Sequence, residues 1–436
     1  MQTLVSTITS TNNSPNGILP GLLIGFFCTA NGFMFHVGSL NLRICDIFFF
    51  LLPIYWILVT RHKHYFYNNN IKKGLFIVFF IFFWITFTGI ANYNNLSPVY
   101  QNFFLKYAIN KLLWIPIYAF IFMAYGGSGF LYGVFYGISL CSLLNTAMVI
   151  YEYIYIQGGS LPKYEFIKSL GIYIDEKKNR VINQGMIRPT GLMLDPNYTG
   201  GYTGIGIIFF DSLYQRYKKI KYLICSIICA VPMFLVFSRT GLFSILLCFL
   251  LSIYIRAKYG KRYSIIYPWV IGLSFICAIL ILSYILALDY QTYEMLVDRL
   301  TMNDSSAGVR SLYIDYYLSL ANPIQIIFGV GNAGYFMSDF WGTSEVWGPE
   351  SSVIALFIEQ GLLFMTIYLI VLIYIFKKLI NINYHYAMIL VYINLIGLSY
   401  NFLGDRVYFF LTCCLTMYCF SSYSSKNIKS KFNHDT

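Results

Sequence analysis

The amino-acid sequence predicts an all-α protein that crosses a membrane about twelve times. Apolar residues make up 58% of its 436 residues, against about 45–50% in soluble chains. Charged residues make up 11%, against about 25% in a soluble chain. Because a spanning helix uses about 20 apolar residues, the chain has room for roughly a dozen such helices. The composition therefore excludes a soluble globular protein.

Polar loops separate the apolar segments, and the chain is interpreted as a single integral membrane domain, residues 1–436. We expect twelve spans: 18–35, 44–60, 74–91, 107–125, 130–156, 192–213, 220–237, 239–255, 264–288, 352–376, 385–401 and 406–421. Residues 1–17 contain no Lys or Arg, so we expect the first span to remain as an anchor and not to be cleaved as a signal peptide.

Basic residues set the expected orientation, with both termini in the cytoplasm. Most of them cluster on one side of the predicted spans, in the loops at 61–73, 216–221, 256–262 and 377–378 and in the C-terminal tail. The net charge of +12 would suggest nucleic acid as a partner of a soluble protein, but here it follows the membrane topology. We therefore expect no nucleic-acid binding.

Two predicted outer loops, 157–191 and 289–351, are much longer than the others, and long loops often carry function. The second should contain a short helix over 307–321, which Asn322 and Pro323 would end. Both loops lack cysteine, the histidines are scattered, and the chain contains no HExxH and no CxxC motif. No disulfide framework, metal or cofactor is expected.

The densest group of candidate functional residues lies where the first long loop enters a predicted span. It contains Arg188, Gly191, Asp195, Pro196 and Asn197. An arginine guanidinium offers a planar fork of donors that suits phosphate, and Gly191 and Pro196 allow a non-helical backbone that can line a cavity. The alternative is that Arg188 only reaches the lipid headgroups and pairs with Asp195.

Three further groups lie on the same predicted side of the membrane. Arg239 stands in the short turn Ser238–Gly241, where it is either an anion ligand or an interface anchor. Arg310 precedes the glycine-rich stretch 328–336, in which Tyr335 could stack on a sugar ring. Glu350 leads into the span at 352–376, either as a general base or as a charge at a helix N-terminus.

Two pairs of glycines inside predicted spans have the small-xxx-small spacing that lets helices approach closely. They are Gly133 with Gly137, and Gly200 with Gly204. Helix packing is the interpretation we favour for both pairs.

In order and in predicted topology, the four groups resemble the Wzy and O-antigen ligase family of bacterial envelope glycosyltransferases. The resemblance covers roughly residues 185–376. It consists of an Arg-x-x-Gly and Pro-Asn motif at 188–197, a Ser-Arg turn at 238–239, the arginine Arg310 that opens a periplasmic helix, a Gly-x-Gly at 329–331 and a Glu-x-Gly at 359–361. It implies a GT-C-like fold in the bacterial inner membrane, with the active site facing the periplasm.

The resemblance also implies an activity, the polymerisation of undecaprenyl-pyrophosphate-linked oligosaccharide repeat units into O-antigen or a related surface polysaccharide. Arg188 and Arg310 would then bind the pyrophosphate with help from Arg239, and Glu350 or Asp195 would orient or deprotonate the acceptor hydroxyl. Asn197 and Tyr335 would contact the substrate. A polysaccharide chain-length regulator would be a further partner.

One departure from the family separates its branches. Ligase members typically carry a His-Asn pair where this chain has Glu350–Ser351, and the loop 289–351 contains no histidine. This favours the polymerase over an O-antigen ligase, which would transfer glycan to lipid A core. A lipid-linked oligosaccharide flippase and a non-enzymatic scaffold remain as alternatives.

Overall fold

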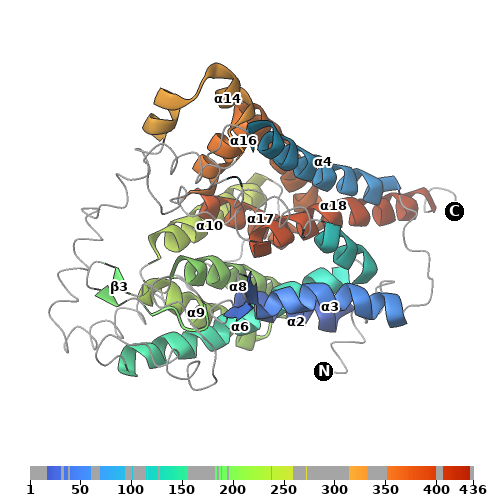
Figure 1. Ribbon diagram of the computed structural model, residues 1–436. Coiled ribbons are helices and arrows are strands. Elements are labelled where there is room, and N and C mark those ends of the chain that lie inside the picture. Colours follow the sequence, from blue (N-terminus) through green and yellow to red (C-terminus); the bar gives the residue numbers. More distant parts are fainter. Residues whose placement is uncertain are drawn as a thin grey trace. The chain divides into compact units, whose positions relative to one another are not determined.

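The computed structural model of the chain is helical over most of the part that it describes (Figure 1). The described residues are 17–30, 34–37, 40–59, 69–93, 101, 114, 116–125, 128–155, 182–183, 186–187, 189–193, 196–236, 238–258, 272, 314–331, 351–398 and 406–432. By their internal contacts the residues form two compact units, one of 1–52 with 129–303 and the other of 53–128 with 304–436.

A described helix overlaps each predicted span except 264–288, which apart from Gly272 lies outside the described residues, as does most of 107–115. Within the described part of the chain, three stretches are long and apolar enough to cross a membrane: Lys72–Asn92, Ser128–Glu152 and Ser352–Ile382. The other apolar helices are shorter, at 10–17 residues. Helical structure and a transmembrane character are thus supported by length and composition.

Two small antiparallel hairpins depart from the all-α prediction. β1 (Met34–Val37) pairs with β2 (Leu40–Arg43), and β3 (Ile182–Asn183) pairs with β4 (Met186–Ile187). The predicted span 18–35 was therefore too long, because its helix, α2 (Ile18–Thr29), ends before β1 begins. The apolar residues of β1 continue the hydropathy of α2, so hydropathy alone did not reveal the change of structure.

The first unit contains α2, the first part of α3 (Ile44–Val59), α6 (Ser128–Tyr155), α8 (Pro196–Tyr217), α9 (Ile220–Leu235) and α10 (Arg239–Lys258). α8 is buried over most of its length and packs on α9 and α10. Side-chain hydroxyls link the helices: Ser142 Oγ of α6 donates to Tyr202 O of α8 at 3.3 Å, and Ser226 Oγ of α9 donates to Ile207 O at 3.2 Å.

Close helix packing explains the glycine pair on α6, as predicted. A Cβ at Gly133 or Gly137 would overlap the carbonyl oxygens of Ile18 and Leu22 on α2. In turn, α2 carries Gly21 and Gly25, whose added Cβ atoms would overlap backbone oxygens of α6. Both helices therefore contribute a small-xxx-small surface, which lets their backbones touch.

The second unit contains α4 (Asn69–Asn92), Pro116–Tyr125, a helix at 314–320, α14 (Pro323–Phe328), α16 (Ser352–Ile382), α17 (Tyr384–Gly397) and α18 (Arg406–Phe432). α16 packs on α4, α14, α17 and α18. Side chains such as Phe83 and Ile370 remain exposed on α4 and α16, as expected of surfaces that face lipid.

Asn322 and Pro323 end the predicted loop helix, as expected, and they also begin the next one. The Asn322 side chain accepts a hydrogen bond from the Gln325 backbone at 2.9 Å, and Gln325 Oε1 accepts one from the Asn322 backbone at 3.1 Å. This reciprocal pair is a capping box, with Pro323 in the first turn, where its missing N–H is not needed.

The contact between α2 and α6 predicts that Gly137→Ala destabilises the protein by about 1–3 kcal/mol, because the new methyl group forces two packed backbones apart. The measurement is the thermal unfolding midpoint in detergent. Gly397→Ala is the matched control, since its Cβ would lie 3.4 Å from Ser352 Cβ, an ordinary contact. A Gly137→Ala midpoint at or above that of the control would contradict the packing described.

Candidate functional site

Of the seven site residues predicted from the sequence, the structure describes Asn197 and Arg239. The other five lie outside the described residues: Arg188, Asp195, Arg310, Glu350 and Tyr335. Described residues directly follow Arg188, Asp195 and Glu350 in the sequence. For these three positions the structure shows the contacts of the residues that follow.

Arg188 is followed directly by a turn that is attached to α6 through its backbone. The N–H groups of Thr190 and Gly191 both donate to Glu152 Oε2, at 3.0 and 2.7 Å. The N–H of Leu192 donates to Asn145 Oδ1 at 2.6 Å. Three successive amides thus point at two side chains that stand two helical turns apart on α6.

The geometry of this turn requires glycine at position 191. Gly191 has a φ of +59°, and a Cβ there would overlap the Asn145 side chain. Met193 N also donates to Thr190 O at 3.1 Å, which closes the turn, and Thr199 Oγ1 of α8 donates to the same oxygen at 3.3 Å. The non-helical backbone predicted at Gly191 is confirmed, and the residue packs against side chains of α6.

Glu152 and Asn145 were not among the residues predicted from the sequence. The structure shows that both are completely buried. A buried carboxylate is costly unless it is hydrogen-bonded, and here two backbone amides donate to its Oε2. The signal available was the isolated acidic residue Glu152 near the end of a predicted span. Its partners could not be found because they come from a loop about 40 residues later.

The Ser238–Gly241 turn begins α10. Ser238 caps the helix, since its Oγ accepts from Gly241 N at 3.3 Å and its carbonyl accepts from Leu242 N at 3.0 Å. Arg239 is then the first residue of α10 and is half-buried.

The first turns of α8 and α10 meet at glycines. A Cβ at Gly241 would lie 3.1 Å from Gly200 Cα, and a Cβ at Gly200 would overlap Ser238 Oγ. Two helix N-termini therefore lie together, with Asn197 in the first turn of one and Arg239 in the first turn of the other. Both helix dipoles are positive at these ends, so the pair favours an anion.

In the second unit, the Gly-x-Gly and Glu-x-Gly motifs form one structure. α16 is interrupted at Gly361, whose φ is +80°. The interruption leaves the carbonyls of Ile358 and Glu359 available, and they accept hydrogen bonds from Val330 N and Gly331 N, both at 2.9 Å. The two motifs, about 30 residues apart in sequence, are thus partners in a helix break.

Side chains of α4 also donate hydrogen bonds to residues at this helix break. Trp84 Nε1 donates to Gln360 O at 3.2 Å, and Thr88 Oγ1 donates to Gln360 Oε1 at 2.9 Å. Asn92 Nδ2 donates to Gly329 O at 3.2 Å. These donors and acceptors are thus hydrogen-bonded within the protein. Non-helical backbone inside a membrane requires such internal partners.

The helix at 314–320, which follows Arg310, packs onto this break. Tyr317 is fully buried against Val330 and Ile358, and its hydroxyl donates to Gln325 O at 2.8 Å. Burial also raises the pKa of Tyr317 above its ordinary value, so the hydroxyl stays protonated and remains a donor. The helix at 314–320 is thereby attached to α16.

Ser351 fixes the start of α16, directly after Glu350. Its Oγ accepts from Ile354 N at 3.3 Å and donates to Leu398 O, at the end of α17, at 2.6 Å. Glu350 directly precedes this capped helix N-terminus in the sequence. Among the described residues, no three His, Cys, Asp or Glu side chains are grouped as metal ligands would be.

Comparisons with protein-family models, with curated proteins and with solved structures find no match to this chain.

The Glu152 contacts predict that Glu152→Ala destabilises the protein by roughly 2–6 kcal/mol, because two buried amides lose their acceptor at about 1–3 kcal/mol each. Glu152→Gln should cost less, since the amide oxygen still accepts hydrogen bonds, though without the help of a charge. Denaturation in detergent measures both variants.

Ile154→Ala is the control for this experiment, because Ile154 lies on the same helix and is 62% exposed. If Glu152→Ala unfolded no earlier than Ile154→Ala, the carboxylate would not be what holds the turn.

Proposed function

We propose that the chain is a membrane glycosyltransferase that polymerises polyprenyl-pyrophosphate-linked oligosaccharide repeat units into O-antigen or a related surface polysaccharide. The observation that carries the proposal is the meeting of two arginine-bearing segments in the first unit. The turn after Arg188 continues into α8, and α8 meets the Arg239 end of α10 at Gly200 and Gly241. Two motifs 50 residues apart in the sequence thus adjoin a pair of neighbouring helix N-termini, which favour an anion.

The proposed setting is the bacterial inner membrane, with about twelve spans, a GT-C-like fold and the active site facing the periplasm. The agreement between the observed helices and the predicted apolar segments supports the spans. The runs of basic residues support the orientation. The substrates are undecaprenyl-pyrophosphate-linked oligosaccharides, and a chain-length regulator is a candidate partner.

The proposed reaction transfers the growing glycan from its carrier to a new lipid-linked unit. A hydroxyl of the new unit attacks the anomeric carbon of the growing chain, and the bond from that carbon to the pyrophosphate oxygen breaks. Glu350 or Asp195 takes the hydroxyl proton, and polyprenyl pyrophosphate leaves. Arg188 and Arg310, with Arg239, neutralise the charge that develops on the leaving group.

The turn beside Arg188 limits which groups can bind the pyrophosphate. Successive backbone amides often form an anion site, but those of Thr190, Gly191 and Leu192 already donate to Glu152 and Asn145. Anion contacts in the first unit must therefore come from the arginine side chains and the helix N-termini of α8 and α10.

Deletion of the gene and analysis of envelope polysaccharide on a gel tests the proposal against its alternatives. A polymerase is supported if the ladder disappears and one core-linked repeat remains. Loss of every repeat indicates a ligase or a flippase instead. An unchanged ladder indicates a scaffold.

Complementation of that deletion with variants tests the proposed role of Arg188 in binding pyrophosphate. Arg188→Lys and Arg188→Ala should both reduce polymer by about 100-fold or more, because a lysine point charge does not replace the bidentate guanidinium. The ladder on the gel is the measurement. Arg216→Lys is the control, since Arg216 lies at the opposite end of α8, over the Tyr217 ring at 5.4 Å. Long polymer from Arg188→Lys would refute the assigned role.

A further inference from the structure

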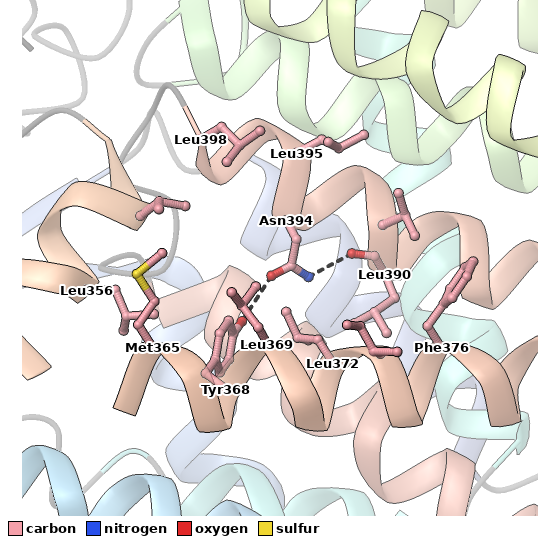
Figure 2. Close-up of a pocket in the computed structure, with 13 residues that line it drawn as sticks. Leu356, Met365, Tyr368, Leu369, Leu372, Phe376, Leu390, Asn394, Leu395 and Leu398 are labelled. Carbon is pink, nitrogen blue, oxygen red and sulfur yellow. Dashed lines mark hydrogen bonds between the residues drawn. The ribbon is translucent and has the colours of Figure 1, made fainter. Parts of the chain in front are cut away.

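An apolar groove of about 300 Å³ lies between α16 and α17 in the second unit (Figure 2). It is lined along α16 from Val353 to Phe376 and along α17 from Leu390 to Leu398. Its lining residues stand on both sides of the break in α16 at Gly361, so the groove is elongated along the helix.

Tyr368 and Asn394 are the only polar residues among those that line the groove, and they satisfy each other. Tyr368 Oη donates to Asn394 Oδ1 at 3.0 Å, and Asn394 Nδ2 donates to Leu390 O at 2.8 Å, as Figure 2 shows. The first of these bonds joins the two helices across the groove, and the second lies within α17. An occupant would not need to supply a hydrogen-bonding group, which suits a hydrocarbon chain.

The groove is open along its side. Leu369 and Ile373 are 46% and 53% exposed at its edge, on a helix that is long and apolar enough to cross the membrane. A flexible chain dissolved in the bilayer could enter sideways, without leaving the hydrocarbon.

One end of the groove lies at the start of α16. Val353 and Leu398 line that end, and the hydrogen bond from Ser351 Oγ to Leu398 O closes it. Glu350, a proposed base, directly precedes Ser351 in the sequence. A lipid with its chain in the groove would therefore present its headgroup near the start of α16.

We propose that this groove holds the polyprenyl chain of a carrier lipid during the reaction. The inference rests on the proposed function, which requires a lipid whose diphosphate stands at the outer surface while its chain remains in the hydrocarbon. It adds the place where the chain lies. The branched, unsaturated isoprenoid fills a groove lined by leucine, isoleucine and valine side chains.

Photo-crosslinking of the full-length protein in phosphatidylglycerol nanodiscs tests this. The probe is polyprenyl pyrophosphate with a diazirine on an isoprene unit near the diphosphate, and mass spectrometry maps the labelled residues. We expect labels on the groove residues of α16 and α17, which unlabelled polyprenyl pyrophosphate reduces and added phosphatidylglycerol does not. Equal competition by phosphatidylglycerol would mean that bulk lipid fills the groove, and would overturn the proposal.

Two variants sharpen the test. Leu372→Trp fills the groove and should reduce labelling about tenfold. Ile370→Trp is the matched control, because Ile370 is 62% exposed on the same helix and does not line the groove. Equal labelling of the two variants would contradict the assignment.

The outcomes for the groove and for the proposed function can be told apart. Labels confined to other helices, in a protein that still elongates glycan, would contradict the assignment of the groove but not the proposed function. No specific labelling anywhere, in a protein that also fails to elongate glycan, would count against both.

Discussion

Backbone polar groups that leave a helix at membrane depth must find partners inside the protein, because hydrocarbon offers none. The structure shows two places where this constraint is met by distant residues. In the first unit, Glu152 and Asn145 of α6 accept the amides of the turn at 190–192. In the second unit, the amides of Val330 and Gly331 donate hydrogen bonds to carbonyls of α16 next to its interruption at Gly361. Both irregular segments carry motifs that the sequence singles out.

Several motif residues therefore have a structural role. Fewer motif residues then remain as candidates for catalysis or substrate binding. Gly191 makes a turn against α6, Gly241 lets α8 and α10 touch, and Gly361 breaks α16. Ser238 caps a helix. Arg188 and Arg239 lie close to such residues in the sequence, and a guanidinium is not required to build a turn.

Hydropathy and turn residues predicted most of the helices, because apolar segments and their polar boundaries are local properties of the sequence. The glycine pair on α6 was likewise interpreted correctly as packing, although its partner pair on α2 was overlooked. The β1–β2 hairpin was missed because its apolar residues extend the hydropathy of α2. Glu152 was missed because its function depends on a loop far along the chain, and periodicity carries no information about such a contact. For the candidate site, the motifs could be recognised in the sequence, but their contacts could not. The structure shows that α8, which begins in the motif at 188–197, meets the turn at 238–241, and that the Gly-x-Gly at 329–331 contacts the Glu-x-Gly at 359–361.

The central claim is that this chain joins lipid-linked glycans to one another, and reconstitution tests it most directly. Purified protein would be incubated with a polyprenyl-pyrophosphate-linked repeat unit, and the products separated by mass. The account predicts carrier lipids that bear two or more repeats, with one polyprenyl pyrophosphate released for each unit joined. Repeats that stay single, or that move only when lipid A core is supplied, would contradict it.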